Sequence, residues 1–161
     1  MSRTLVLMRH GKSGYPAGVG DHERPLAERG QREAALAGRW MGDEGLQIDA
    51  VVCSTATRTR QTLERTGIDV PTVYVDDVYG GAPDEILEAL RVHAPPDAQT
   101  VMVVGHSPGM PATALTLDAD GHIDRFPTSA YAVVTLGTPW DRVGLDVDAD
   151  ARLVGVRIPR E

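Results

Sequence analysis

Three short apolar runs restrict the folds open to this sequence. They are Thr4–Met8, Ala50–Cys53 and Val101–Val104, and none of them alternates apolar with polar residues. A strand that is apolar at successive positions is typical of a parallel sheet covered by helices, because both of its faces are buried. The runs therefore predict a mostly parallel central sheet in an α/β fold.

Helical periodicity fills the stretches between and after these runs. Ala34, Ala37 and Met41 recur at helical spacing in the segment 28–41, which follows Pro25. Further helix-like segments come later in the chain, at 57–65, at 83–93 and after Pro108 as far as Leu117. Helices placed between the strands in this way can cover both faces of the sheet.

The remaining strands change the character of the sheet. Val73 marks a short strand, whereas Ala130–Leu136 and Arg152–Ile158 are β-rich runs separated by Gly, Pro and Asp. Such runs near the end of the chain are typical of antiparallel strands at a sheet edge. We expect a three-layer α/β sandwich with a mostly parallel central sheet, helices on both faces and an antiparallel edge.

The length and composition fit one ordinary domain spanning residues 1–161. A single cysteine, Cys53, rules out an internal disulfide framework and a zinc site built from several cysteines. The chain has 16 Lys and Arg against 23 Asp and Glu, a net charge of −7. This acidic balance disfavours nucleic acid as a partner.

No segment is predicted to target or anchor the chain. The apolar run within Met1–Arg9 is too short for a signal peptide, and no stretch approaches the ~18 apolar residues of a membrane helix. We expect a cytoplasmic protein without a membrane partner. The sequence does not set the oligomeric state and is compatible with a monomer.

Four cationic or imidazole side chains follow the three apolar runs. Arg9 and His10 follow the first run, Arg58 lies in the first turn of the helix after the second, and His106 follows the third. Ligands of open α/β sheets bind outside the carboxyl ends of the strands, so these side chains should meet in one crevice. Two arginines and two histidines suit a dianionic phosphoryl group, and each charge-assisted hydrogen bond contributes roughly 1.5–3 kcal/mol. Because these motifs contain no carboxylate, we expect no bound metal.

This cluster also predicts a chemistry. One histidine can attack phosphorus and become phosphohistidine, while the other donates a hydrogen bond to the phosphoryl oxygens. Neighbouring arginines should lower the pKa of the nucleophile and keep it neutral.

A serine hydrolase is an alternative of another class. Gly105–Gly109 reads GHSPG, which matches the G-x-S-x-G pattern and lies between a predicted strand and a predicted helix. Pro108 has no N–H, however, where the oxyanion hole needs the N–H of the residue after the nucleophile. His122 is the sole histidine downstream of Ser107.

A module that binds phosphate or a phosphoprotein without catalysis is a further alternative. It would need the arginines for affinity but no nucleophile. The presence of both histidines beside both arginines counts against it.

Five segments together resemble the histidine phosphatase superfamily, the phosphoglycerate-mutase-like proteins, in its SixA-type phosphohistidine phosphatase branch. They are Leu7–Gly11 (LMRHG), Asp21–Gly30 (DHERPLAERG), Ser54–Thr62 (STATRTRQT), Val103–Pro108 (VVGHSP) and Thr128–Ala130 (TSA). The resemblance spans nearly the whole chain. It departs from the commoner pattern at Ser107, where Asn is more frequent.

The resemblance implies a role for each matched residue. His10 is the nucleophile, and Arg9, Arg58 and His106 complete the phosphate pocket around it. Arg24 lies near the rim of that pocket and is a further phosphate-binding candidate. No metal and no organic cofactor is implied.

The general acid is not assigned by these motifs. Many members of the family supply a Glu from an insertion that follows the segment matching Ser54–Thr62 and precedes the third apolar run. Such an insertion forms a lid over the site, but residues 59–104 leave little room for one. Asp21 is our first candidate for protonating the leaving group, ahead of Asp77 and Glu85. A site without a lid can admit a phosphorylated protein. We therefore expect a metal-independent phosphatase for phosphohistidine in proteins, with a small phosphate ester as the alternative substrate.

Overall fold

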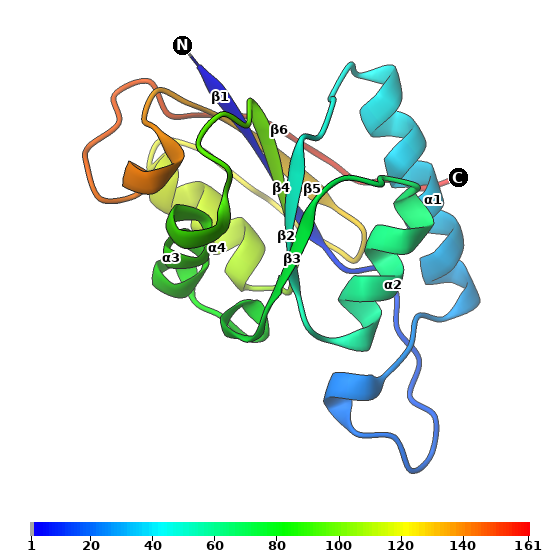
Figure 1. Ribbon diagram of the computed structural model, residues 1–161. Helices are drawn as coiled ribbons and strands as arrows, with labels where there is room; N and C mark the ends of the chain where they lie inside the picture. The colour runs from blue at the N-terminus through cyan, green and yellow to red at the C-terminus, as the bar shows by residue number, and fades with distance from the viewer. Residues whose placement is uncertain (1) are drawn as a thin grey trace.

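The three apolar runs form neighbouring strands at the centre of a six-stranded sheet, whose order is β3-β2-β4-β1-β5-β6. The computed structural model describes residues 2–161 (Figure 1). The strands are β1 (Arg3–Arg9), β2 (Ala50–Ser54), β3 (Thr72–Val75), β4 (Thr100–Gly105), β5 (Tyr131–Leu136) and β6 (Arg152–Arg157). The helices are α1 (Glu28–Asp43), α2 (Thr57–Thr66), α3 (Pro83–His93) and α4 (Gly109–Leu117), with short 3-10 turns η1 (Asp21–Glu23), η2 (Asp76–Val78) and η3 (Trp140–Arg142).

The strand directions confirm the predicted sheet. Strands β3, β2, β4 and β1 run parallel, whereas β5 is antiparallel to β1 and β6 is antiparallel to β5. Within the β1–β4 pair, Arg9 lies opposite Gly105. The residues that follow these two, His10 and His106, therefore leave the sheet side by side.

Alternate residues of the central strands enter two separate cores. Leu5 and Leu7 of β1 belong to the core that also holds residues of α3 and α4. Val6 and Met8 belong to the core that holds residues of α1 and α2. Figure 1 shows the two helix pairs on opposite faces of the sheet. This arrangement confirms the three-layer sandwich, and it explains why the strands are apolar at every position.

The predicted element ends differ from the observed ones by one or two residues. Helix α1 continues to Asp43 rather than ending at Met41, and α2 ends at Thr66. Strand β6 ends at Arg157. Within residues 2–161, no helix is both long and apolar enough to cross a lipid bilayer.

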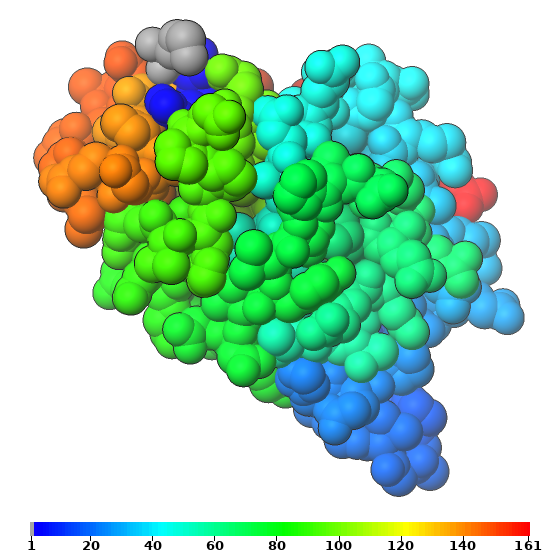
Figure 2. Space-filling model, viewed as in Figure 1, coloured from blue at the N-terminus to red at the C-terminus, as the bar shows by residue number. Residues whose placement is uncertain are grey.

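Residues 12–27 form an arm that leaves the carboxyl edge of the sheet between β1 and α1. Figures 1 and 2 show it standing out from the body of the molecule. The N–H of Ala27 donates to the carbonyl of Lys12 at 2.8 Å, and Ser13 bridges to Leu26, so the base of the arm is closed. The arm carries Asp21 in η1 and places it at the edge of the sheet where the strand-end residues emerge.

The core on the α3 face predicts a stability difference between two residues of that helix. Leu90 is fully buried, whereas Val92 is 66% exposed. Leu90→Ala should lower the free energy of unfolding by about 2–5 kcal/mol, because it removes buried contacts and leaves a cavity. Val92→Ala, the matched control, should change it by no more than about 0.5 kcal/mol. Urea unfolding measures both, and equal losses would contradict this packing.

Candidate active site

Two imidazole rings meet at the carboxyl ends of β1 and β4. The ring centroids of His10 and His106 are 5.3 Å apart. The backbone N–H of His10 donates to the carbonyl of Gly105 at 3.0 Å, so the β1–β4 pairing continues one residue past the strand. The predicted meeting of these two histidines is confirmed.

The tautomer of His10 is set by its neighbour in the chain. His10 Nδ1 lies 2.7 Å from the carbonyl oxygen of Gly11, which can only accept a hydrogen bond. Nδ1 therefore carries the proton, and Nε2 is left with a free lone pair. A neutral imidazole with a free nitrogen is the form that can act as a nucleophile.

Close packing fixes the backbone turn after His10. The N–H of Gly11 donates to Thr62 Oγ1 at 2.9 Å. A Cβ atom on Gly11 would lie 2.8 Å from the carbonyl oxygen of Gly30, so only glycine fits there. Gln61 Oε1 accepts from the N–H of Leu26 at 2.8 Å. Gln61 and Thr62, at the end of the Ser54–Thr62 segment, thus anchor both ends of the arm's base.

Two arginines flank the histidines. Arg58, buried on the first turn of α2, donates from Nη1 and Nη2 to Asp21, and Nη2 lies 3.5 Å from His106 Nδ1. Arg9 donates from Nη1 to the carbonyl of Phe126 at 3.1 Å. The Nε atoms of both arginines are buried and have no hydrogen-bond partner within the described chain. A buried guanidinium with spare donors is suited to binding an anion.

A serine at the end of β2 holds the second histidine. His106 Nε2 lies 2.8 Å from Ser54 Oγ, and Ser54 Oγ also accepts from the N–H of Ala56 at 3.3 Å. This contact fixes the plane of the His106 ring against the sheet. His122, the downstream histidine that the serine-hydrolase alternative would use, is exposed and lies 2.6 Å from Asp124, and no hydrogen bond joins it to Ser107 within residues 2–161.

Both histidines are neutral at pH 7. Burial, with the positive charges of Arg58, Arg9 and Arg24, lowers the pKa of His10 from 6.5 to about 4, against an opposing hydrogen bond to Gly11. Burial and the neighbouring His10 and arginine charges lower the pKa of His106 to about 3. The sequence-based expectation of a neutral nucleophile agrees with this environment, although desolvation contributes more than the arginine charges.

Asp21 lies against the arginines rather than apart from them. Its Oδ2 accepts from Tyr79 Oη at 2.5 Å and from Arg58 Nη2 at 3.2 Å, and its Oδ1 accepts from Arg24 Nε at 3.0 Å. These hydrogen bonds, that of Tyr79 first and that of Arg24 second, hold the pKa of the Asp21 carboxyl well below its ordinary value. In the unliganded site Asp21 is therefore a carboxylate and carries no proton to donate.

The other sequence candidates take the following positions. Arg24 donates from Nη1 to Ser13 Oγ at 2.6 Å and to the carbonyl of Gly14 at 3.2 Å, which places it at the base of the arm. Glu85 Oε1 accepts from the N–H of Ala82 at 3.0 Å and so caps α3. Asp77 lies in η2, on the turn after β3.

Sequence reasoning missed Tyr79 and His22, whose rings contact each other at the rim of the site. The Tyr79 ring stands edge-on to His106, with ring centroids 5.4 Å apart, and to His22, at 4.9 Å. Tyr79 follows η2, in a turn that has no helical or strand periodicity. A lone tyrosine before two glycines gives no sequence signal that would place it beside a histidine more than twenty residues away.

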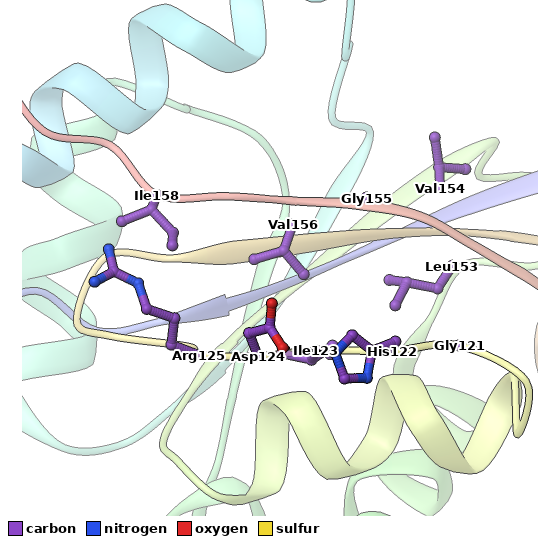
Figure 3. A pocket seen from close by; sticks show the side chains of 10 residues that line it. All are labelled: Gly121, His122, Ile123, Asp124, Arg125, Leu153, Val154, Gly155, Val156 and Ile158. Carbon is purple, nitrogen blue, oxygen red and sulfur yellow. Dashed lines mark hydrogen bonds and ion pairs between the residues drawn. The ribbon is translucent and has the colours of Figure 1, made fainter.

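Hollows of two kinds lie near these residues. A cavity of about 200 Å³ adjoins His106 and is lined by the turn 80–83 and the start of α4. A separate groove of about 510 Å³ lies between residues 121–125 and β6 (Figure 3). Its lining includes Arg125 and the exposed pair of His122 and Asp124, and it contains none of the four strand-end residues. The cavity beside His106 is therefore smaller in volume than the groove along β6.

Within residues 2–161, no group of three or more His, Cys, Asp or Glu side chains is placed to hold a metal ion. The guanidinium groups of the half-buried Arg9 and the buried Arg58 supply the positive charges for binding an anion here. A phosphoryl group bound between them would also meet His10. The arrangement can bind a phosphoryl group and transfer it to a histidine.

Comparison with protein families agrees with this geometry. Residues 5–77 match the model of the histidine phosphatase superfamily (branch 1). An uncharacterized protein of Mycobacterium tuberculosis is 44% identical over 163 residues, which cover 95% of this chain and 100% of that protein.

Solved structures share the fold over nearly the full length. A structure from Nakamurella multipartitia, assigned to the SixA phosphohistidine phosphatases, is 41% identical with a TM-score of 0.88, covering 99% of this chain and 97% of its own. The structure of the protein histidine phosphatase SixA complexed with tungstate is 25% identical with a TM-score of 0.81, covering 97% of each chain.

The buried positions of His10 and His106 predict an unusual titration. As the pH falls from 7, both rings should stay neutral to about pH 5, because their pKa values are depressed below the ordinary range. The Cε1–H resonances, assigned by replacing each histidine in turn, should shift only near pH 4 for His10. A midpoint near 6.5 for His10 would contradict the burial of its ring.

Proposed function

The chain belongs to the histidine phosphatase superfamily, in its SixA-type branch, and from this premise we propose a metal-independent phosphatase that acts through phospho-His10 on phosphohistidine in proteins. The phosphatase activity itself follows from the family. One observation carries the proposed mechanism: a neutral His10 with a free Nε2 lies next to two arginines whose Nε atoms are buried and unpartnered.

In the first step, the phosphoryl group binds to Arg9 and Arg58, and Nε2 of His10 attacks phosphorus in line. The Nε2–P bond forms as the bond to the leaving group breaks, and the leaving group keeps the electron pair and takes up a proton. His106 donates a hydrogen bond from Nδ1 to a phosphoryl oxygen as charge develops there, while its Nε2 accepts from the Ser54 hydroxyl. Water then attacks phosphorus, the Nε2–P bond breaks with its electrons returning to His10, and phosphate and a proton are released.

A shared oxyanion preference supports the phosphate assignment. Tungstate is a tetrahedral dianion like the phosphoryl group, and the SixA structure of similar fold is complexed with it. The strand-end arginines and histidines of this chain are arranged to bind such an anion. Four or more charge-assisted hydrogen bonds, at roughly 1.5–3 kcal/mol each, would hold it without a metal.

The proposed protein substrate rests on the openness of the site. The segment 59–104 is taken up by the rest of α2, by β3, η2 and α3, and by most of β4. It therefore provides no long insertion to close over His10, and a phosphorylated side chain on another protein can reach the pocket. Imidazole is also an easier leaving group than an alkoxide, which suits a site without a protonated carboxyl.

A small phosphate ester is the second candidate substrate. The cavity of about 200 Å³ beside His106 favours it, because a small organic group attached to the bound phosphoryl group could enter there. Its lining by Ala82, Pro83 and Pro108 is mostly apolar. This cavity offers few polar groups to recognise a sugar.

We also propose that Asp21 protonates poor leaving groups. As an unliganded carboxylate it has no proton, but its hydrogen bond to Arg58 can be replaced by the phosphoryl group. If Asp21 also leaves Tyr79 and Arg24, the two largest causes of its lowered pKa, that pKa would rise, because these hydrogen bonds no longer stabilise the ionised form. The assignment predicts a dependence on the leaving group.

The covalent step predicts a phosphoenzyme. Incubation with a labelled aryl phosphate, followed by a rapid quench, should give protein-bound label that is stable to alkali and lost in acid, as expected for phosphohistidine. His10→Ala should abolish the label and lower kcat by at least about 10³-fold, since the nucleophile is removed.

His122→Ala is the matched control, because His122 is an exposed histidine outside the site. It should leave both the label and the rate unchanged. Full activity in His10→Ala, together with the absence of label in the unchanged protein, would refute the mechanism.

The acid assignment predicts a selective loss in Asp21→Asn. The variant should lower kcat on alkyl phosphates by about 10²-fold or more, the usual size of acid catalysis, and should spare phosphohistidine and aryl phosphates. Steady-state rates on the three substrate types test it. An equal loss on all three would show that Asp21 does not act as the proton donor.

A further inference from the structure

The anion-binding donors of Arg58 are already occupied within the chain. Its Nη1 donates to the backbone carbonyl of Asp21 at 2.7 Å, and its Nη2 donates to Asp21 Oδ2 at 3.2 Å. One residue thus contacts both ends of the guanidinium fork, the feature with which arginine binds a phosphoryl group. Asp21 therefore stands where a substrate oxygen would be bound.

The two partners differ in how firmly they are placed. The Arg58 side chain is 7% exposed, whereas that of Asp21 is 57% exposed. Arg58 is a buried residue of α2, so its side chain cannot move away without disturbing the packing around that helix. The exposed Asp21 carboxylate can move into water, where solvation replaces the hydrogen bonds that it gives up. Exchange of the Asp21 carboxylate for a phosphoryl oxygen therefore requires movement of Asp21 alone.

Two further groups hold Asp21 in this place. Tyr79 Oη donates to the same Oδ2 that contacts Arg58, and Arg24 Nε donates to Oδ1. Arg24 is itself fixed by Ser13 Oγ at 2.6 Å. The carboxylate is thereby aimed at Arg58 from the arm on one side and from the turn after η2 on the other.

We propose that Asp21 is an internal competitor of phosphate, which occupies Arg58 between turnovers and returns to it to expel the product. This inference rests on the proposed function, because it assumes that Arg58 binds the phosphoryl group. Two arginines with buried, unpartnered Nε donors would otherwise retain inorganic phosphate. Arginine contacts that bind the product as tightly as the transition state do not raise kcat. A competitor that weakens product binding therefore helps phosphate to leave.

Binding of inorganic phosphate to the intact protein tests the proposal by calorimetry. Asp21→Asn should bind phosphate at least about fivefold more tightly than the unchanged protein, the lower end of usual coupling between two ligands. The same variant should show a correspondingly lower inhibition constant for product phosphate. In this variant kcat on an alkyl phosphate would fall, whereas the affinity for inorganic phosphate would rise.

Glu23→Gln is the matched control, because it removes one negative charge from the same 3-10 turn. Glu23 contacts His22 Nδ1 at 3.2 Å and lies two residues beyond Asp21. Its affinity for phosphate should stay within about twofold of the unchanged protein, since exposed charges interact weakly through water. An equal tightening in both variants would overturn the proposal, because general charge would then account for it.

Tyr79→Phe supplies an independent variant. It removes the hydroxyl that aims Asp21 at Arg58, so phosphate should bind more tightly, though less so than in Asp21→Asn. In the double variant Tyr79→Phe should add nothing, because its effect acts through the carboxylate. Tyr74→Phe, on the exposed edge strand β3, should change nothing.

The outcomes separate this inference from the proposed function. Unchanged or weaker phosphate binding in Asp21→Asn, with normal binding in the unchanged protein, would overturn the competitor role and leave the phosphatase mechanism intact. Failure of every form to bind phosphate would overturn both.

Discussion

The parallel pairing of β1 with β4 determines the geometry of the site. Because Arg9 lies opposite Gly105, the next residues on the two strands, His10 and His106, emerge at the same level with ring centroids 5.3 Å apart. A shift of one residue would send one imidazole to the other face of the sheet, since side chains alternate along a strand. The buried, fully apolar strands resist such a shift, so the packing of the core also fixes the distance between the two histidines.

Electrostatics then decides what those residues can do. The chain carries a net charge of −7, yet the candidate site concentrates the half-buried Arg9 and the buried Arg58 next to two neutral imidazoles. Burial acts on both kinds of group. It keeps His10 unprotonated, and it leaves the Nε donors of both arginines without a partner within residues 2–161. An acidic protein can therefore bind a phosphoryl group strongly at one point without attracting polyanions over its surface.

Much of this was predictable from local patterns. Apolar runs of uniform character indicated buried parallel strands, and residues at the carboxyl ends of such strands must share one edge of the sheet. That rule predicted that Arg9, His10, Arg58 and His106 lie near one another, as they do in the structure. The predicted ends of helices and strands were wrong by one or two residues, because the last turn of a helix and the last paired residue of a strand depend on tertiary contacts. The Tyr79 contact was not predictable, since no periodicity links the turn after η2 to the arm.

The sequence by itself indicated the fold class, which the structure confirms, and the meeting of the four strand-end residues that the proposed phosphate chemistry uses, because both follow from periodicity and from the direction of parallel strands. Only the tertiary structure decided the state of each group. The Gly11 carbonyl selects the His10 tautomer, Ser54 holds His106, and Asp21 is a carboxylate paired with Arg58 rather than a protonated acid. Each of these depends on distances between segments far apart in the chain, and hydrogen bonding and charge vary too steeply with distance to be read from residue order.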